Sequence, residues 1–471
     1  MKRTSIQRVL GGPRLTRRQL AVSGAAMAGV AAVGAQASGM SLPALVQGIA
    51  TPQAADDGFA EPPMLSSKDG VLNVTLQAMD VENMNAPVLG FNNSFPGPTL
   101  HFKPGDTVKV AFVNAISQMT NLHVHGLHVS PRDNSDNVFV HVQPGQTFGY
   151  EFRIPDDHPG GTYWYHPHPH GTSANQVGAG LAGAMIIDGA LDEVEGIAGL
   201  KERLLVMQGP FRAAGGQIDT LINGVANPKI TIAPGETQRW RLVNASANQF
   251  LNVKLVGHPL HVIARDGNPL SQVRTVQNEL IGPGERAEVL IQGSDAGIYE
   301  LRSLAFAPDI PAQTQPEMLL ATVICGGEAR QPQELPTDLV TLDDLGKDEV
   351  AEKRTISFQM PDSPPRLAID NKAFVEDRID TTVKLGTTEE WTIRNESGQW
   401  HPFHIHVNDF QVMSINGEPQ PVNRHDTTPL PPRGEIVIRH RFLDFTGRFV
   451  YHCHILVHED NGMMAVIEVV E

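Results

Sequence analysis

The chain has few cysteines, few cations and no long apolar run outside its N-terminal region. Cys325 and Cys453 are the only cysteines among 471 residues, which excludes a framework of several disulfides. No stretch after the N-terminal region is long and apolar enough to cross a membrane. Lys and Arg number 36 against 52 Asp and Glu, and this acidic balance argues against nucleic acid as a partner.

Glycine and proline, in contrast, are abundant. The sequence contains 44 Gly and 35 Pro and is 41% hydrophobic, a composition that favours a turn-rich β protein over a helical one. At about 150 residues per domain, the length corresponds to roughly three domains.

The N-terminal region has the features of an export signal. Residues 1–37 carry six Lys and Arg and no acid, followed by a small, apolar run over 20–35 and an Ala35-Gln36-Ala37 cleavage site. The Arg17-Arg18 pair resembles the twin-arginine signal, and an ordinary secretory signal is the alternative. We therefore expect a protein exported to the periplasm or beyond by the twin-arginine (Tat) machinery, with a flexible mature N-terminus over 38–61. Without the signal, 30 cations face 52 acids, a formal charge of about −22.

The rest of the chain repeats one unit three times. Each copy has a Gly-centred turn and then an alternating strand that closes on Asn, at Asn114, Asn244 and Asn395. Each copy also has a later strand that begins with Gly, at Gly161, Gly297 and Gly447. Short strands at regular spacing are typical of Greek-key sandwiches. We predict an all-β protein of three tandem Greek-key β-sandwich domains, over 62–192, 193–345 and 346–471.

The repeat allows the positions of the histidines to be compared between the three units. His-x-His pairs stand nine and eleven residues after Asn114 and after Asn395, where the middle unit has Val253 and Leu255. The first and third units each add a second pair on their penultimate strand. The four pairs are His123 with His125, His166 with His168, His404 with His406, and His452 with His454. This symmetry predicts one metal cluster between the first and third units, with the middle unit as a spacer.

A second site is predicted around Cys453. Because a strand alternates its faces, Cys453 should point away from the side to which His452 and His454 point. One thiolate, two imidazoles and an axial thioether are the ligands of a copper electron-transfer site. We assign His401, Cys453 and His458 as equatorial ligands and Met463 as the axial one, with Met464 as a competitor. Cys325 is then expected to be a buried free thiol rather than a disulfide partner of Cys453.

Taken together, these motifs resemble those of the multicopper oxidases: laccases, bacterial cuprous and ferrous oxidases, and ascorbate oxidase. The resemblance covers nearly all of the mature chain and implies cupredoxin-like domains with four copper ions. It places the type 1 copper at the Cys453 site and the type 2 copper on His123 and His404. The type 3 pair would be bound by His125, His166, His168, His406, His452 and His454.

The resemblance also implies two acids that deliver protons. Glu459 matches the acid found at this position in some bacterial members. The second family acid follows the first His-x-His-Gly motif, and here its spacing is shifted. We prefer Asp136 to Asp133, because Asp136-Asn137 best replaces the usual Asp-Gly. For both, the alternative is a turn Asp that caps its own backbone.

The implied activity couples four one-electron oxidations of a small reducing substrate to the reduction of dioxygen to water. The 14 Met are scattered, and the absence of a Met-rich run favours phenols or aromatic amines, a laccase-like activity. Oxidation of Cu(I), Fe(II) or Mn(II) is the alternative, which the negative charge favours. A copper-buffering protein and a copper-free structural relative are less favoured, because every ligand motif is complete. We expect a monomer.

Overall fold

The structure, a computed structural model, describes residues 53–54, 58–82, 88–212, 218–308 and 313–471. The predicted signal peptide over 1–37 lies outside the described residues. Within these ranges, no helix has the length and apolar character that a membrane span requires.

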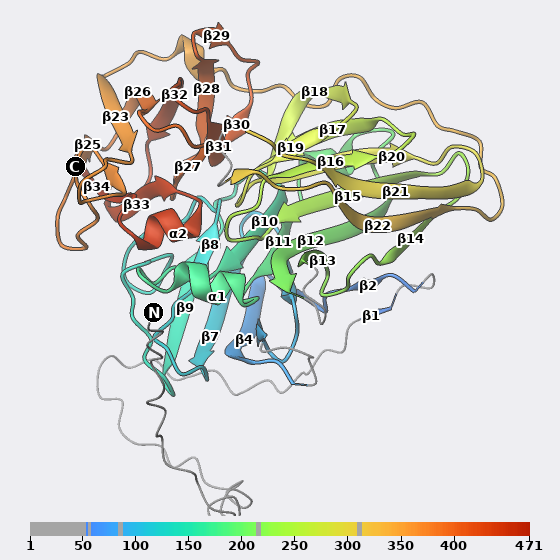
Figure 1. Cartoon of the computed structure of the whole chain (residues 1–471), viewed down its shortest axis with the longest axis horizontal. Coiled ribbons are helices and arrows are strands. Elements are labelled where there is room, and N and C mark those ends of the chain that lie inside the picture. Colours follow the sequence, from blue (N-terminus) through green and yellow to red (C-terminus); the bar gives the residue numbers. More distant parts are fainter. Residues whose placement is uncertain (1–52, 55–57, 83–87, 213–217, 309–312) are drawn as a thin grey trace, which may run out of the picture. The chain divides into compact units, whose positions relative to one another are not determined.

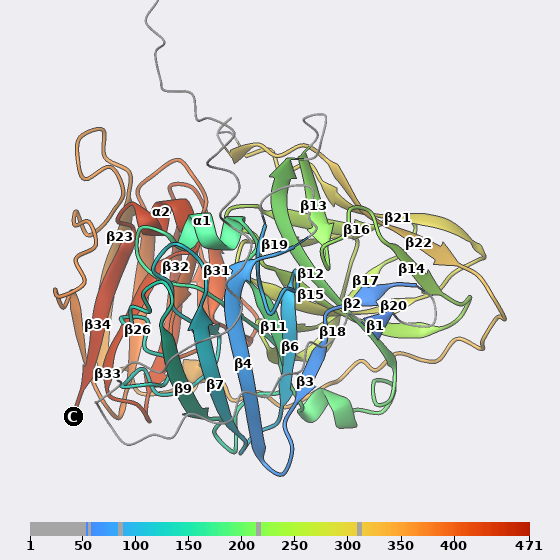
Figure 2. The same ribbon diagram turned by 90° about the horizontal axis from the view of Figure 1, so that it is seen from below.

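The first unit contains two sheets that enclose a core of buried aliphatic and aromatic side chains. One sheet has the order β3 Met64–Ser66, β6 Gly97–Phe102, β11 Gly183–Ile187, β10 Gly161–His166 and β8 His123–His125. The other has the order β5 Leu89–Phe91, β4 Val71–Asp80, β7 Thr107–Asn114 and β9 Thr147–Arg153. Figure 2 shows β4, β7 and β9 side by side, with β4 parallel and β9 antiparallel to β7.

The middle unit repeats this arrangement around its own core. Its first sheet has the order β13 Ile218–Ile222, β12 Lys201–Arg212, β15 Thr237–Asn244, β20 Arg286–Gln292, β17 Leu260–Arg265 and β18 Asn268–Val276. Its second sheet has the order β14 Lys229–Ile232, β22 Met318–Cys325, β21 Gly297–Leu304, β16 Leu251–Leu255 and β19 Glu279–Ile281.

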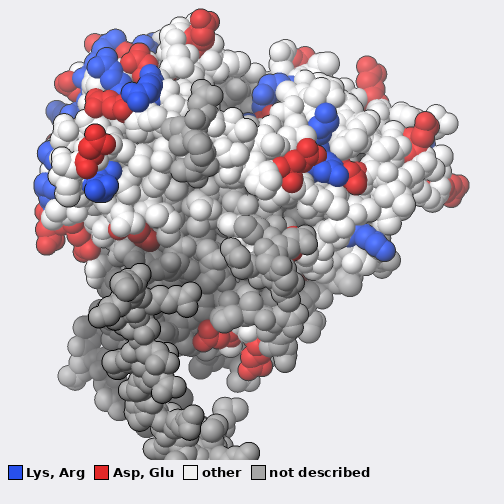
Figure 3. Space-filling view, in the orientation of Figure 1, with Lys and Arg blue, Asp and Glu red and all other residues white. Residues whose placement is uncertain are grey.

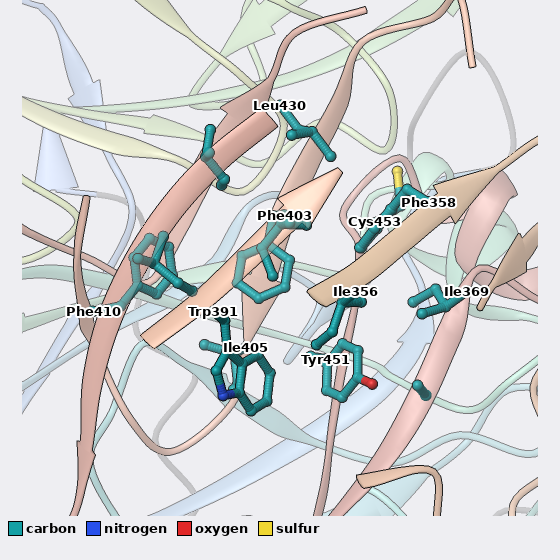
Figure 4. Close-up of a cluster of buried hydrophobic side chains, with 14 of the residues drawn as sticks. Ile356, Phe358, Ile369, Trp391, Phe403, Ile405, Phe410, Leu430, Tyr451 and Cys453 are labelled. Carbon is teal, nitrogen blue, oxygen red and sulfur yellow. The ribbon is translucent and has the colours of Figure 1, made fainter. Parts of the chain in front are cut away.

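The third unit also consists of two sheets that enclose a core (Figure 1). One sheet has the order β24 Ala368–Ile369, β23 Glu352–Gln359, β26 Thr387–Asn395, β32 Glu435–Phe442, β28 Phe410–Ile415 and β29 Glu418–Pro419, with β30 Arg424–His425 also paired to β28. The other has the order β25 Thr381–Lys384, β34 Met464–Val470, β33 Gly447–Cys453, β27 His401–Ile405 and β31 Thr427–Leu430. Figure 4 shows the core between them, which includes Trp391, Phe403, Tyr451 and Cys453.

A few short elements complete the described part of the chain. They are the β1 Gln53–Ala54 and β2 Ala60–Glu61 pair, the helices α1 Ser173–Gly178 and α2 Leu456–Asp460, and the 3-10 turns Ala190–Glu193 and Leu345–Lys347. The Asp460 carboxylate on α2 accepts hydrogen bonds from the backbone N–H groups of Ser173 and Ala174 on α1. This contact ties the first unit to the third.

The all-β, three-unit prediction is confirmed, and the repeat extends to hydrogen bonds. The strand-closing Asn of each unit donates its side-chain amide to two or more backbone carbonyls further along the chain: Asn114 to Gln118 and Val142, Asn244 to Gln249 and Ile281, and Asn395 to Gln399, Leu430 and Pro431. These bonds satisfy backbone carbonyls where the hydrogen bonds between neighbouring strands end, which explains why each unit has Asn at this point.

The last residues of the segment 38–61, which we expected to be flexible, pack against the middle unit. Phe59 is buried in the core of the middle unit, and the Ala60 carbonyl accepts a hydrogen bond from Asn223. An aromatic ring that can enter a neighbouring core orders the short segment that carries it.

On the face shown in Figure 3, the visible Lys and Arg side chains lie among Asp and Glu instead of forming an extended basic patch.

Candidate functional site

Strand pairing brings the four His-x-His pairs together. In the first unit β10 pairs with β8, which sets His166 opposite His123. In the third unit β33 pairs with β27 in the equivalent register, which sets His452 opposite His404. In the first and third units, two of the predicted ligands therefore face each other across neighbouring strands of one sheet.

The strand alternation predicted around Cys453 is present. The Cys453 sulfur lies 3.4 Å from His401 Nδ1 and 3.6 Å from His458 Nδ1, and these two nitrogens are 3.2 Å apart. A point at the centre of this triangle is about 2 Å from each atom, the length of a bond between a metal and imidazole or thiolate. The structure thus brings together the three predicted equatorial residues, with His458 contributed by helix α2 and only partly buried.

Met463 is buried in the same cluster as Cys453. Its backbone N–H donates to the His458 carbonyl, and its carbonyl accepts from the Cys453 N–H. The turn after α2 therefore returns Met463 to the Cys453 site. Met464, in contrast, is the first residue of β34 and packs with Val138, Val450 and Val466 in another cluster.

The eight paired histidines form three further groups of convergent ring nitrogens. These groups are His123, His125 and His404; His125, His166 and His454; and His168, His406 and His452. In the third group, His452 Nε2 is 3.1 Å from His168 Nε2 and 3.3 Å from His406 Nε2. In the second, His454 Nε2 is 3.2 Å from His125 Nδ1. All eight side chains are buried, so no solvent competes for these nitrogens.

The protonation of these rings suits a metal. Burial lowers the pKa of His166 and His452 to about 3 and that of His458 to about 4. Burial and repulsion between neighbouring imidazoles lower the pKa of the other cluster histidines as well. The rings are therefore neutral at pH 7, which is the form that binds metal ions.

Hydrogen bonds on the outer side fix which nitrogen faces inward. His123 Nδ1 donates to Asp136, His166 Nδ1 to the Pro167 carbonyl, His404 Nδ1 to the Asp426 carbonyl, and His452 Nδ1 to the Cys453 carbonyl. The inward nitrogens of His123, His166 and His404 then have no hydrogen-bond partner among the described residues. Buried nitrogens with free lone pairs that converge within these groups fit copper, which binds imidazole strongly.

The Cys453 site has the same outer support. The His401 Nε2 lies 2.7 Å from the Ser397 hydroxyl, which leaves His401 Nδ1 to face the sulfur. Burial raises the pKa of the Cys453 thiol, so the thiolate needs a cation beside it. Soft sulfur with two imidazoles selects copper over metals that prefer oxygen ligands.

The two predicted proton-delivering acids both lie beside this cluster. Asp136 is buried, accepts from the Val124 N–H, and holds His123 Nδ1 at 3.0 and 3.1 Å from its two oxygens. Its alternative, Asp133, is exposed in a turn with a φ of 53°. Glu459 is fully buried, with oxygens 3.6 Å from His168 Nδ1 and 3.3 Å from His452 Nδ1. The geometry thus favours Asp136 over Asp133.

The expectation that the middle unit is only a spacer is wrong. Arg286 of β20 forms a two-pronged ion pair with Asp426, which contacts the cluster histidines. At Gly284, an added Cβ would lie 2.8 Å from the His454 ring. The Gln313 amide also exchanges two hydrogen bonds with the backbone of Trp400, the residue before His401. The middle unit therefore lies against both the histidine cluster and the Cys453 site.

Sequence reasoning missed Arg286 and Asp426, because neither stands near a ligand motif. Asp426 follows His406 by twenty residues and lies between β30 and β31, and Arg286 belongs to a unit without predicted ligands. The second cysteine behaves as predicted: Cys325 is free and buried, and its thiol donates to the Ser294 carbonyl.

Comparison with known proteins agrees with this geometry. Three family models described as multicopper oxidase match residues 73–191, 198–318 and 347–471. A relative named multicopper oxidase mco, from Staphylococcus haemolyticus, is 31% identical over 438 residues, which cover 86% of this chain and 90% of the relative. A cell division protein, FtsP of Dickeya dadantii, is 27% identical over 436 residues, with the same two coverages. A solved multicopper oxidase from Campylobacter jejuni, described as a metallo-oxidase, superposes with a TM-score of 0.76 at 30% identity, covering 87% of this chain and 94% of that one.

Proposed function

Because the chain belongs to the multicopper oxidase family, a family of copper-dependent oxidoreductases, we propose that it couples four one-electron oxidations of a small substrate to the reduction of dioxygen to water. One observation carries the proposal. Cys453 belongs to one triangle of ligands, while its two neighbours, His452 and His454, belong to two others. A single strand end thus joins a one-electron site to a multi-metal site by a few covalent bonds.

The ligand assignments are part of this proposal. Four copper ions are assigned: a type 1 ion to His401, Cys453, His458 and axial Met463; a type 2 ion to His123 and His404; and a type 3 pair to the other six cluster histidines. When bound, copper supplies the one-electron redox chemistry that no amino-acid side chain of this site provides. The convergent nitrogens described above support the assignment.

The protein's own residues then have three tasks. The buried sandwich cores hold the imidazoles at fixed separations, so that little rearrangement is needed when the charge of the site changes. Glu459 stands behind His168 and His452, and Asp136 stands behind His123, so each acid can hold a proton close to where dioxygen is reduced. The tight packing around His452 and His454 excludes bulk water from the path between the two sites.

The reducing substrate is proposed to be a phenol or an aromatic amine that docks at the partly buried edge of His458. Two side chains near this ligand set favour an apolar substrate. Val457, the neighbour of His458, is 48% exposed, and Trp400, the neighbour of His401, is half-buried. Apolar rims of this kind bind aromatic rings by burial of their faces.

A metal ion is the second candidate substrate. The formal charge of −16 for the whole chain would attract Cu(I), Fe(II) or Mn(II), and the Campylobacter jejuni protein of similar structure is described as a metallo-oxidase. Oxygen uptake by copper-loaded protein, measured in turn with a phenol, Fe(II) and Cu(I), separates these candidates. Absence of uptake with all of them would refute the oxidase and favour a structural role.

Export completes the proposal. A twin-arginine signal over 1–37 would carry the folded protein across the membrane with its copper bound. A single cleavage after Ala37 in the exported protein, found by N-terminal sequencing, is the expected result. An exported protein that retained Arg17 and Arg18 would contradict it.

A further inference from the structure

Asp426 contacts the cluster from the outer side at two points. Its carboxylate Oδ1 accepts from His125 Nε2 at 2.9 Å, and its backbone carbonyl accepts from His404 Nδ1 at 2.7 Å. The side chain of Thr427 lies 3.1 Å from each of the same two nitrogens. A short segment just before and at the start of β31 therefore determines the inward nitrogen of one histidine from the first unit and one from the third.

Arg286 fixes the carboxylate of Asp426 in turn. Its Nη1 and Nη2 donate to the two oxygens at 2.8 and 2.6 Å, in the planar, two-pronged geometry that distinguishes arginine from lysine. Two further guanidinium donors are used, because Nε donates to the Thr162 carbonyl and Nη1 to the Gly284 carbonyl. Arg286 is fully buried, and its backbone N–H donates to the Asp266 carboxylate. The guanidinium cannot turn without breaking bonds to all three units.

Stability alone does not explain this arrangement. A buried arginine–carboxylate pair loses its hydration, and apolar residues of similar volume often stabilise a fold as well or better. The pair does provide orientation. With Asp426 accepting from His125 Nε2, the other nitrogen of that ring, Nδ1, keeps its lone pair and faces His454 Nε2. A carboxylate on the outer nitrogen also makes an imidazole a stronger ligand.

We propose that Arg286 and Asp426 are positioning residues of the histidine cluster, which hold His125 and His404 in the ring orientation and tautomer that bind copper. The middle unit thereby completes a site to which it contributes no ligand. This proposal rests on the proposed function, since it concerns the same cluster.

The test compares Arg286→Met and Asp426→Asn with Arg239→Lys as a matched control. Arg239 is also a buried arginine of the middle unit in contact with carboxylates, those of Glu288 and Asp192, but within the described part of the chain it bonds to no cluster histidine. Each protein is loaded with copper, and three quantities are measured: the blue absorption of the Cys453 site, the electron paramagnetic resonance spectrum of the type 2 copper, and copper retention against a chelator.

In the two test variants we expect an unchanged blue absorption, an altered type 2 spectrum and cluster copper held about 10- to 100-fold more weakly. The Arg239→Lys control should match the wild type in all three. Arg286→Lys, which keeps the charge but not the fork, covers the case in which Arg286→Met does not fold, and it should also alter the type 2 spectrum. Wild-type spectra and copper retention in Arg286→Lys and Asp426→Asn would overturn the proposal.

None of these readouts is turnover. A wild-type protein that binds copper and consumes no oxygen would refute the proposed function, whereas the positioning role would still be decided by the spectra and the chelator titration.

Discussion

Replacing His166 by phenylalanine should have opposite effects on the copper-free and copper-loaded protein. His166 Nε2 is buried without a partner among the described residues, which costs about 1–3 kcal/mol in the copper-free state. The substitution removes this nitrogen but also removes the Nδ1 bond to the Pro167 carbonyl, worth about 0.5–1.5 kcal/mol. A phenyl ring can keep the stacking on Trp164, whose centroid is 4.2 Å away. The difference between these two ranges is about −0.5 to 2.5 kcal/mol, so the copper-free variant should be more stable than the wild type by about 1 kcal/mol.

The copper-loaded variant should lose stability instead. Removal of a direct ligand weakens binding by more than the 10- to 100-fold typical of outer residues, which corresponds to more than about 1.4–2.8 kcal/mol. Urea unfolding with and without copper gives both values. The matched control is His440→Phe, because His440 is buried with neither ring nitrogen bonded in the described structure and packs on Trp391, outside the cluster. His440→Phe should change both forms equally. Equal stabilisation by copper in His166→Phe and the wild type would refute the inward orientation of His166.

Three further predictions concern single side chains. Cys453→Ser should abolish the blue absorption and reduce substrate oxidation to background, and a blue band that survives would contradict the thiolate assignment. Asp136→Asn should slow oxygen uptake about 10- to 100-fold without changing the blue band, because the lost carboxylate bonds His123 and the Val124 N–H and no described ligand of the Cys453 site. An unaltered rate would show that Asp136 has only a structural role. Burial raises the pKa of Glu288, but Arg239 and Arg241 outweigh it and lower that pKa from 4.5 to about 2. Ionised Glu288 should thus stabilise the fold by about 3 kcal/mol above pH 4.5, and this should be lost as pH falls towards 2. Unfolding at pH 7 and pH 3 checks this, and Glu288→Gln should flatten the dependence.

The features that could be predicted from the sequence are those that a repeat or a strand period determines. The nine- and eleven-residue spacing after Asn114 and Asn395 located two His-x-His pairs, because equivalent strands of equivalent sandwiches begin at the same distance. The alternation of a strand separated Cys453 from its two neighbours. Both are short-range patterns, so the sequence of this chain alone is sufficient to find them.

The features that escaped prediction depend on contacts between distant parts of the chain. Arg286 and Asp426 are 140 residues apart, and their pairing depends on how the middle unit packs against the third. The position of His458 on the short helix α2 was also not foreseen, since five residues are too few to show a helical period. Phe59 was assigned to a flexible segment because nothing local reveals that its ring enters a distant core.

The most direct test of the central claim is the stoichiometry of oxygen consumption. The two sites joined at Cys453 should act as one unit, so copper-loaded protein should oxidise four equivalents of a one-electron substrate for each dioxygen consumed and release no hydrogen peroxide. Release of peroxide, or reduction of the blue site by substrate with no oxygen consumed, would contradict the account. Either result would mean that electrons do not pass from Cys453 through His452 and His454 to the histidine cluster.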